Sequence, residues 1–316
     1  MHQNKIIGEG FTAPYGGNHA EVNAVNSVKN KALLKNATIY VTLEPCSHFG
    51  KTPPCADLLV KHNFKSVVIG CLDTNSLVAG KGIERLKNAG INVIVGVLET
   101  ECREHHKRFF TVQEKKRPYI ILKWAQTKNG FIAPLTKDKQ QPVFISNQYS
   151  QQFVHKWRSQ EYAILVGTNT VIADNPKLNV RTWAGNNPIR IVLDKSLRIS
   201  KQASVFNNQV KTIVFTEEKN IDKEFNENVF FETIDFSKNV AEQICNTMQK
   251  HQIQSVIIEG GTQTLQTFID ANLWDEAKVF VGESLFRSGV EAPILSAKIT
   301  TEVKIKNDIL KTYTND

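Results

Sequence analysis

Four residues near the start of the sequence have the types and spacing of a catalytic zinc site. His19 is followed two positions later by Glu21, and two cysteines, Cys46 and Cys55, each come directly after a proline. Imidazole nitrogen and thiolate sulfur bind zinc well, and a catalytic site uses three protein ligands and keeps a fourth position for water. Glu21 is then placed to move protons without binding the metal. The chemistry indicated is hydrolysis by a zinc-activated water.

The order of these residues, His-x-Glu followed by Pro-Cys and a second cysteine, is the pattern of zinc deaminases. The usual pattern closes with Cys-x-x-Cys, whereas eight residues separate Cys46 from Cys55 here. A closed structural zinc site is the alternative, and it would recruit His48 or His62 as a fourth ligand. His48 and Lys51 lie between the cysteines, where they either meet a substrate or are solvated loop residues.

Alternating strands and helices are expected to position these residues. The run Thr38–Leu43 is β-branched and aromatic, which predicts a strand, and Pro54 suits the first turn of a helix that begins at Cys55. A thiol at a helix N-terminus is favoured as thiolate. The first half is predicted to be α/β, with further strands at 5–11, 66–70 and 91–97, helices at 19–30, 55–63 and 82–88, and a charged helical stretch at 99–116.

A second group of candidate residues lies in the other half of the chain. The apolar run Ser255–Ile258 predicts a strand that ends in Glu259 and paired glycines and leads into a helix. Glycines let a phosphate approach the backbone, and the helix N-terminus offers unpaired N–H groups; an ordinary strand–turn–helix connection is the alternative. Further strands are predicted at 119–126, 163–167, 189–194, 212–216 and 276–282, with helices at 147–158, 240–250 and 262–271.

Several motifs together resemble one family. Residues 40–55 (YVTLEPCSHFGKTPPC), 73–82 (DTNSLVAGKG), 170–176 (TVIADNP) and 259–261 (EGG) are similar to those of the bifunctional riboflavin-biosynthesis deaminase-reductases. The resemblance implies a cytidine-deaminase-like zinc domain over residues 1–117 and a dihydrofolate-reductase-like domain over residues 118–316. It also implies two reactions on phosphorylated pyrimidines: a zinc-dependent deamination of diaminohydroxyphosphoribosylaminopyrimidine, and an NADPH-dependent reduction of the product's ribose to a ribityl chain.

The resemblance also implies roles for individual residues. Glu21 is the catalytic proton carrier, and His19, Cys46 and Cys55 hold Zn²⁺. The NADPH contacts it implies are Ala125, Phe144, Thr170, Asp174, Gly260, Gly261 and Thr262. The substrate contacts it implies are Arg158, Leu178, Arg181 and Glu259, with the two arginines on the ribose phosphate. His48 and Lys51 are added as candidate substrate contacts only because of their place between the cysteines.

The start of the chain departs from the family pattern. Members begin with a helix, a Pro-Asn-Pro segment and a first strand, none of which precedes residue 5 here. We therefore expect the deaminase domain to be incomplete at its N-terminus, and the strand predicted at 5–11 to lack a neighbour. A reductase-only protein with an inactive, truncated deaminase domain is the alternative.

The composition of the chain limits the classes of molecule that it is expected to bind and the compartment in which it is expected to work. The net charge of +8 suits anionic metabolites and NADPH; a zinc-stabilised nucleic-acid-binding module is the rival, but the lysines are scattered and no aromatic–basic motif accompanies them. Five cysteines are an odd number, which favours a reducing cytoplasm over a disulfide framework. No run approaches a membrane span and no signal peptide is evident, so neither membrane nor export is expected. The oligomeric state is left open, a homo-oligomer included.

Overall fold

The chain forms two compact units. A computed structural model describes residues 1–14, 16–74, 79–221 and 225–315. The first unit is Met1–Lys115 and the second is Lys116–Asp316; each is described by itself. Part of the 73–82 motif, residues 75–78, lies outside the described residues. Within the described residues, no helix combines the length and the apolar character needed to cross a bilayer.

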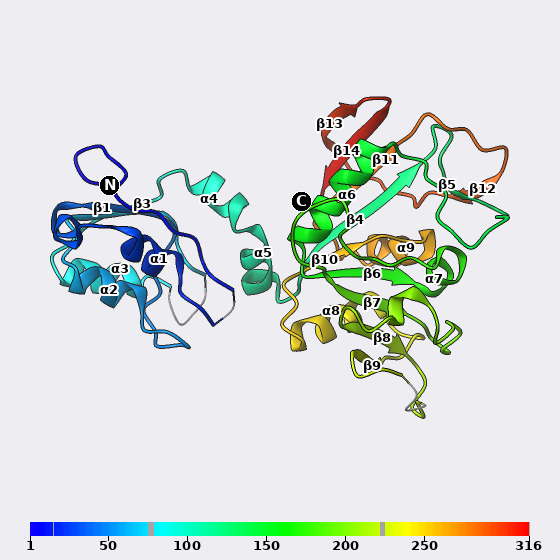
Figure 1. Cartoon of the computed structure of the whole chain (residues 1–316), viewed down its shortest axis with the longest axis horizontal. Helices are drawn as coiled ribbons and strands as arrows, with labels where there is room; N and C mark the ends of the chain where they lie inside the picture. Colours follow the sequence, from blue (N-terminus) through cyan, green and yellow to red (C-terminus); the bar gives the residue numbers. More distant parts are fainter. Residues whose placement is uncertain (15, 75–78, 222–224, 316) are drawn as a thin grey trace. The chain divides into compact units, whose positions relative to one another are not determined.

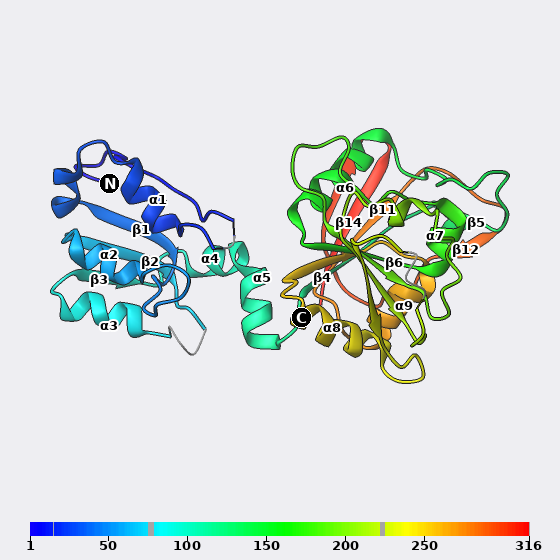
Figure 2. The ribbon, with the colours of Figure 1, turned by 60° about the horizontal axis from the view of Figure 1, so that its bottom comes forward.

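The first unit is built on a parallel sheet with the strand order β1-β2-β3. Its strands are β1 (Thr38–Leu43), β2 (Ser66–Cys71) and β3 (Asn92–Val95). They alternate with helices, and Figure 2 shows α2 and α3 beside each other along the sheet. The helical elements are α1 (Ala20–Ser27), η1 (Lys31–Asn36), α2 (Cys55–Lys61), α3 (Lys81–Asn88), α4 (Glu99–His105), α5 (Lys107–Phe110) and η2 (Thr111–Lys115). Their apolar faces meet the sheet in one core that includes Leu34, Leu59, Val67, Ile69 and Leu86, all at most 2% exposed.

The prediction of a strand at residues 5–11 is wrong. Apart from an isolated bridge between His2 and Lys5, this segment has no strand pairing. It runs along α1 instead, where a Cβ atom on Gly8 would come within 2.5 Å of the Val28 side chain and one on Gly10 within 2.4 Å of the Ala24 nitrogen. A strand needs a hydrogen-bonding neighbour, and this segment packs on a helix rather than beside β1.

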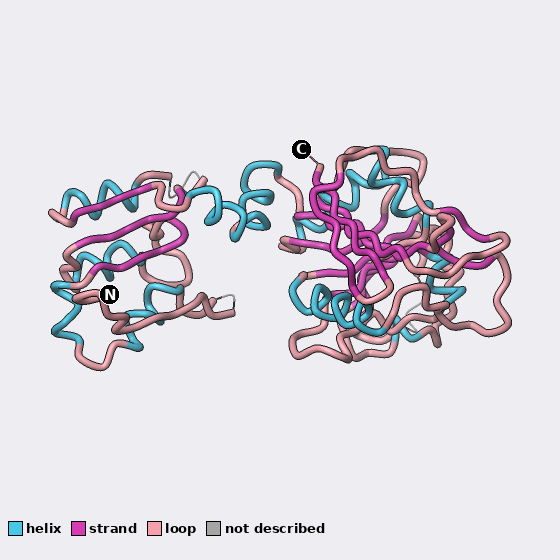
Figure 3. The backbone as a smooth tube through the Cα atoms, turned by 90° about the horizontal axis from the view of Figure 1, so that it is seen from above, coloured by secondary structure: helices cyan, strands magenta, loops and turns pink. Residues whose placement is uncertain are grey.

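The second unit contains a nine-stranded sheet in the order β13-β14-β11-β4-β10-β6-β7-β8-β9. The strands from β11 to β9 pair in parallel, and β14 and β13 add an antiparallel edge. Figure 3 shows these strands gathered in the middle of the unit. The parallel strands are β4 (Tyr119–Gln126), β6 (Ala163–Gly167), β7 (Ile189–Leu193), β8 (Thr212–Thr216), β9 (Val229–Thr233), β10 (Ser255–Ile258) and β11 (Glu276–Val281); the edge strands are β13 (Ile299–Ile305) and β14 (Asp308–Thr314).

Helices cover both faces of this sheet. Buried side chains of α6 (Gln148–Gln160) and α7 (Thr168–Asp174) pack on one face, and those of α8 (Val240–Lys250) and α9 (Thr262–Asp270) on the other. Figure 1 shows the helices on either side of the strands. The predicted strands and the three predicted helices of this half are all present. The remaining elements, β5 (Phe131–Pro134) paired with β12 (Gly289–Glu291), η3 (Ser204–Phe206), α7, β9, β13 and β14, were not predicted.

The order of the strands brings residues that are far apart in the sequence together on neighbouring central strands of the sheet. Strand β10 lies between β4 and β6, with Ile258 in register with Leu122 on one side and Leu165 on the other. The next residue along each strand is therefore Lys123 on β4 and Glu259 after β10. Residues in register on neighbouring strands project from the same face, so the two charged groups become neighbours although they are far apart in sequence.

A buried ion pair fixes the start of the second unit. Arg117 donates to both carboxylate oxygens of Asp275, at 2.5 and 2.8 Å, and the Ile120 amide donates to the same carboxylate at 2.9 Å. Both charged residues are less than a tenth exposed. The pair therefore joins the entry of β4 to the entry of β11.

We expect Asp275→Asn to lower the free energy of unfolding of the second unit by about 3–5 kcal/mol, because it leaves Arg117 buried without its counter-charge. Urea unfolding followed by circular dichroism measures the change. Asp235→Asn is the matched control, since this aspartate lies on the surface in a local turn. A loss below about 1 kcal/mol for Asp275→Asn, which is the range of an exposed pair, would contradict this reading.

Candidate functional sites

Three chain segments bring the predicted zinc ligands together. His19 is the residue before α1, Cys46 lies in the loop after β1, and Cys55 opens α2. Their ligand atoms all lie within 4.8 Å of one another. The His19 Nδ1 atom lies 3.5 Å from the Cys46 sulfur and 3.4 Å from the Cys55 sulfur. Among the described residues this cluster contains neither His48 nor His62, so the closed structural site is not supported.

The separations fit a tetrahedral zinc ion. With Zn–S bonds of about 2.3 Å and Zn–N bonds of about 2.0–2.1 Å, nitrogen and sulfur ligands of one ion lie roughly 3.5 Å apart. The two observed nitrogen–sulfur distances match that value. The Cys55 backbone N–H donates to the Cys46 sulfur at 3.2 Å, a contact that stabilises a thiolate on Cys46. The donor set is therefore that of a three-ligand zinc site.

Glu21 lies beside this cluster on the first turn of α1. Burial raises the pKa of its carboxyl group, although a backbone hydrogen bond acts in the opposite direction. A carboxyl group with a raised pKa exchanges a proton more readily near neutral pH. The geometry thus pairs a metal cluster with an adjacent proton-exchanging group.

The sequence analysis missed one buried carboxylate in this unit. Glu44 is 3% exposed and accepts backbone N–H groups from Gly80 and Gly82 at 3.0 Å, and from Asp73 and Ile83 at 3.3 Å. It therefore caps the N-terminus of α3 through a side chain far away in sequence. The signal available was its place in Leu-Glu-Pro-Cys: a charged residue at the end of a predicted buried strand requires partners.

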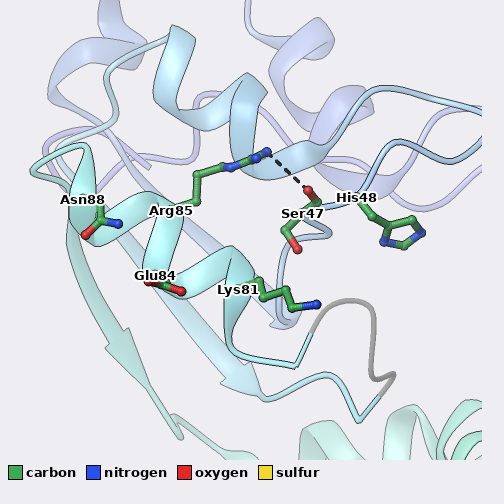
Figure 4. Close-up of a pocket in the computed structure, with 6 residues that line it drawn as sticks. All are labelled: Ser47, His48, Lys81, Glu84, Arg85 and Asn88. Atoms are coloured by element: carbon green, nitrogen blue, oxygen red, sulfur yellow. Dashed lines mark hydrogen bonds between the residues drawn. The ribbon is translucent and has the colours of Figure 1, made fainter.

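The loop between the cysteines lies against α3. Ser47 and His48 line a cavity of about 520 Å³ together with Lys81, Glu84, Arg85 and Asn88 (Figure 4). Arg85 donates to the Ser47 carbonyl at 3.3 Å and to Asp57 at 2.7 Å. Lys51 is exposed and lies near Gly16, where a Cβ atom would be 3.6 Å from the Lys51 side chain. His48 and Lys51 thus lie on the loop that carries both cysteines and are not themselves ligands.

The glycine turn after β10 has the features of a phosphate cradle. Gly260 has φ +103°, which favours glycine, and Gly261 precedes α9 without any side chain capping the helix N-terminus. The first N–H groups of a helix need partners and attract an anion. Thr262 donates its hydroxyl to the Glu291 carbonyl, and Thr170 on α7 faces the turn, its oxygen 3.5 Å from the Cβ position of Gly261. These residues fit the pyrophosphate of a dinucleotide.

Other predicted cofactor contacts lie around this turn or farther out. Asp174 ends α7 one turn beyond Thr170 and forms an ion pair with Lys137. Ala125 lies on β4, two residues beyond Lys123. Phe144 is 66% exposed on the loop before α6. The structure thus gathers Thr170, Gly260, Gly261 and Thr262 and leaves Phe144 open to solvent.

Glu259 is the centre of a buried charge cluster. Arg158 on α6 donates to its two oxygens at 2.8 and 2.7 Å, and the Lys123 ammonium lies 3.6 Å from the carboxylate. Burial alone would raise the pKa of Glu259, but Arg158 and Lys123 together hold it at about 2. Burial lowers the pKa of Lys123. Sequence analysis missed Lys123, although a lysine inside a predicted buried strand is itself a signal.

Leu178 and Arg181 lie on the loop after α7. Leu178 is 3% exposed with φ +52°, and Arg181 lies on the surface, where its guanidinium donates to the Asn179 side chain at 2.7 Å. Arg158 reaches the Asn179 carbonyl at 3.4 Å. The two predicted phosphate-binding arginines therefore meet at one loop, but Arg158 is already committed to Glu259 and Arg181 is the more accessible cation.

Comparisons with known proteins agree with both halves. Residues 118–310 match the family described as RibD C-terminal domain, and residues 1–71 match the cytidine and deoxycytidylate deaminase zinc-binding region. The riboflavin biosynthesis protein RibD of Aquifex aeolicus is 39% identical over 92% of this chain and 81% of its own. That of Escherichia coli is 34% identical over 91% of this chain and 81% of its own.

Solved structures give the same result. The crystal structure of a diaminohydroxyphosphoribosylaminopyrimidine deaminase/5-amino-6-(5-phosphoribosylamino)uracil reductase from Thermotoga maritima is 34% identical, with a TM-score of 0.90 over 99% of this chain and 90% of that one. Acinetobacter baumannii RibD gives 0.88 at 32% identity, over 99% and 90%. The expected fold class, a cytidine-deaminase-like domain followed by a dihydrofolate-reductase-like domain, is confirmed.

We expect the purified chain to bind one zinc ion and Cys46→Ala to lose most of it, since two ligands do not make a tight site. Metal analysis by inductively coupled plasma mass spectrometry measures the content. Cys245→Ala is the control, because this cysteine is buried in α8 and lies in the second unit. Equal zinc content in the Cys46 variant and the unaltered protein would contradict the ligand assignment.

We expect the second unit to lose stability as the pH falls from about 6.5 to 4. Burial first, and then Arg158 and Arg181, lower the pKa of His155 on α6 from 6.5 to about 4. In that window the unfolded chain binds the proton and the folded chain does not, so the folded state is disfavoured by roughly 1–3 kcal/mol. Urea unfolding at pH 7.5, 5.5 and 4.5 measures the loss, and His155→Asn, which does not titrate, should reduce it. An unchanged pH dependence in that variant would contradict the assignment.

Proposed function

The chain belongs to the RibD family of riboflavin biosynthesis proteins, and on that premise we propose that it catalyses two consecutive reactions on phosphorylated pyrimidines. Residues 1–117 deaminate diaminohydroxyphosphoribosylaminopyrimidine with zinc. Residues 118–316 reduce the ribose of 5-amino-6-(5-phosphoribosylamino)uracil to a ribityl chain with NADPH. The observation that carries the proposal is the presence, in one chain, of the three-ligand cluster beside Glu21 and of the Glu259 charge cluster beside a glycine turn.

In the deaminase, His19, Cys46 and Cys55 hold zinc, which supplies an activated water. Glu21 would carry the two protons of the attacking water in turn, the first to the ring nitrogen and the second to the departing ammonia. Its pKa, raised by burial, suits both acceptance and release of the proton. His48 and Lys51, on the loop between the cysteines, are assigned to the substrate side.

In the reductase, the glycine turn with Thr170 and Thr262 holds NADPH, with Ala125, Phe144 and Asp174 as further contacts, and NADPH supplies the hydride. Lys123 would donate a proton to the ribose ring oxygen as the bond from that oxygen to C1 breaks and C1 takes the hydride, so that the ring opens to the ribityl chain. Its proximity to Glu259 keeps the ammonium beside a carboxylate at 3.6 Å, and burial lowers its pKa, which makes it a better proton donor. Leu178 packs at the substrate side.

The ribose phosphate is assigned to Arg181, with the positive charge of Arg158 behind it. Both guanidinium groups donate a hydrogen bond to Asn179 on the same loop. A guanidinium on a phosphate forms charge-assisted hydrogen bonds of a strength that ordinary neutral pairs do not reach. The glycine turn, which is assigned to the cofactor, and the loop 178–181, which is assigned to the phosphate, thus lie on two sides of Glu259 and Lys123.

We expect Glu21→Gln to abolish deamination and leave reduction intact, and Lys123→Met to do the reverse. Loss of a positioned acid or base lowers kcat by roughly a hundredfold or more, while zinc content and NADPH binding persist in the Glu21 variant. Each half-reaction is assayed separately, ammonia release for the first and NADPH absorbance for the second, so each variant is the control for the other. Unchanged deamination in a zinc-replete Glu21→Gln protein, or unchanged reduction in the Lys123 variant, would overturn the corresponding role.

A further inference from the structure

His155 is a buried imidazole to which the proposed reactions give no role. It lies on α6 three residues before Arg158 and is 6% exposed. Its ring contacts Asn179 and Arg181 in the loop 178–181 that follows α7, where Arg181 is assigned to the ribose phosphate. The inference drawn from it rests on that proposed function.

The imidazole contacts the main chain of this loop at two residues. The Arg181 amide donates to its Nδ1 atom at 3.4 Å, and the Asn179 backbone forms a hydrogen bond with the ring. A neutral imidazole has one acceptor and one donor nitrogen, so acceptance at Nδ1 leaves the proton on Nε2. The Arg181 contact therefore requires the neutral ring, whereas the Asn179 contact favours the protonated ring.

Other contacts also hold this loop: Leu178 is buried in the core, and Arg158 donates to the Asn179 carbonyl at 3.4 Å. Leu178 has φ +52°, a backbone conformation that residues other than glycine adopt at an energetic cost. The Val180 amide donates to the Asn187 side chain at 2.8 Å, and the Arg181 guanidinium is directed by the Asn179 side chain at 2.7 Å. The direction of this guanidinium thus depends on the main chain at Asn179 and Arg181, which are the two residues that His155 contacts.

Three charged neighbours act on the same ring. Arg158 and Arg181 disfavour a positive charge on His155, whereas Glu259 favours it. Arg158 neutralises Glu259 through two hydrogen bonds, so the arginines prevail. Burial first, and then the two arginines, therefore keep His155 neutral and able to accept the Arg181 amide.

We propose that His155 is a positioning residue for substrate binding: through Nδ1 it holds the Arg181 main chain so that the guanidinium is ready for the ribose phosphate. It acts on the phosphate only through Arg181. Loss of the Nδ1 contact raises the substrate KM and leaves the cofactor site, built on β10, α9 and α7, unaffected.

Two amide variants separate this role from packing. In His155→Asn the side-chain oxygen reaches the position of Nδ1 and still accepts the Arg181 amide, whereas in His155→Gln the amide extends to the position of Nε2 and the Nδ1 acceptor is lost. We expect the Gln variant to raise the substrate KM about tenfold, which corresponds to about 1.4 kcal/mol. The Asn variant should stay within about threefold, and kcat and the NADPH Kd from fluorescence titration should change less than about twofold in both. Equal KM values for the Gln and Asn variants would overturn the proposal.

The substitution His155→Gln in an Arg181→Ala protein tests whether His155 acts through Arg181. If His155 acts through Arg181, His155→Gln adds no further increase in KM there, because coupled residues are not additive. An undiminished tenfold increase would overturn the proposal.

A binding measurement separates this inference from the proposed reaction. Ribose 5-phosphate titrated by calorimetry needs no turnover, and we expect the unaltered and Asn proteins to bind it alike and the Gln and Arg181→Ala proteins to bind it about tenfold more weakly. Absence of turnover with this affinity pattern intact would refute the proposed reaction and leave the role of His155 standing. Ribose 5-phosphate binding that is equal in all four proteins would refute the role of His155.

Discussion

The second unit depends on one buried carboxylate. Glu259 could not remain ionised in its place without Arg158 and Lys123, because burial alone disfavours its charge. The three groups come from different elements: a strand, a helix and the turn after another strand. Each is in reach of the others only because β10 lies between β4 and β6. The strand order is thus a requirement of the chemistry and not only of packing.

The cluster also fixes what surrounds it. Glu259 is directly followed by the glycine turn, so the anchoring of its side chain by Arg158 holds the start of α9 near α7 and Thr170. Arg158 continues to the Asn179 carbonyl and thereby to the loop of Arg181. A single ion pair consequently connects the assigned cofactor turn with the assigned phosphate loop. Breaking a buried pair by removing one partner costs more than the pair itself contributes, so both ends depend on it together.

Local chemistry made the zinc site predictable from the sequence. His19, Cys46 and Cys55 have few other reasons to occur at that spacing, and the strand at Thr38–Leu43 and the helix from Cys55 follow from composition and from Pro54. Sequence analysis failed where a partner lies far along the chain. Glu44 satisfies four backbone N–H groups from residues 73–83, and Lys123 is explained only by Glu259; no local pattern reveals either pairing.

Two errors in the predicted strands have the same cause, because strand pairing cannot be read from the local sequence. A strand was expected at 5–11 and did not form, whereas β13 and β14 formed without being predicted. Residues 5–11 were expected to form a strand, yet a strand exists only where a neighbour offers hydrogen bonds. Here the glycines at positions 8 and 10 let the segment lie against α1 instead. Residues 299–305 are mostly exposed and polar, so they carry little hydrophobic pattern. They form β13 because β14 pairs with them and with β11. Pairing, which is a tertiary property, overrode the local sequence in both places, whereas the zinc ligands were set by their own residue type and so were predicted from the sequence.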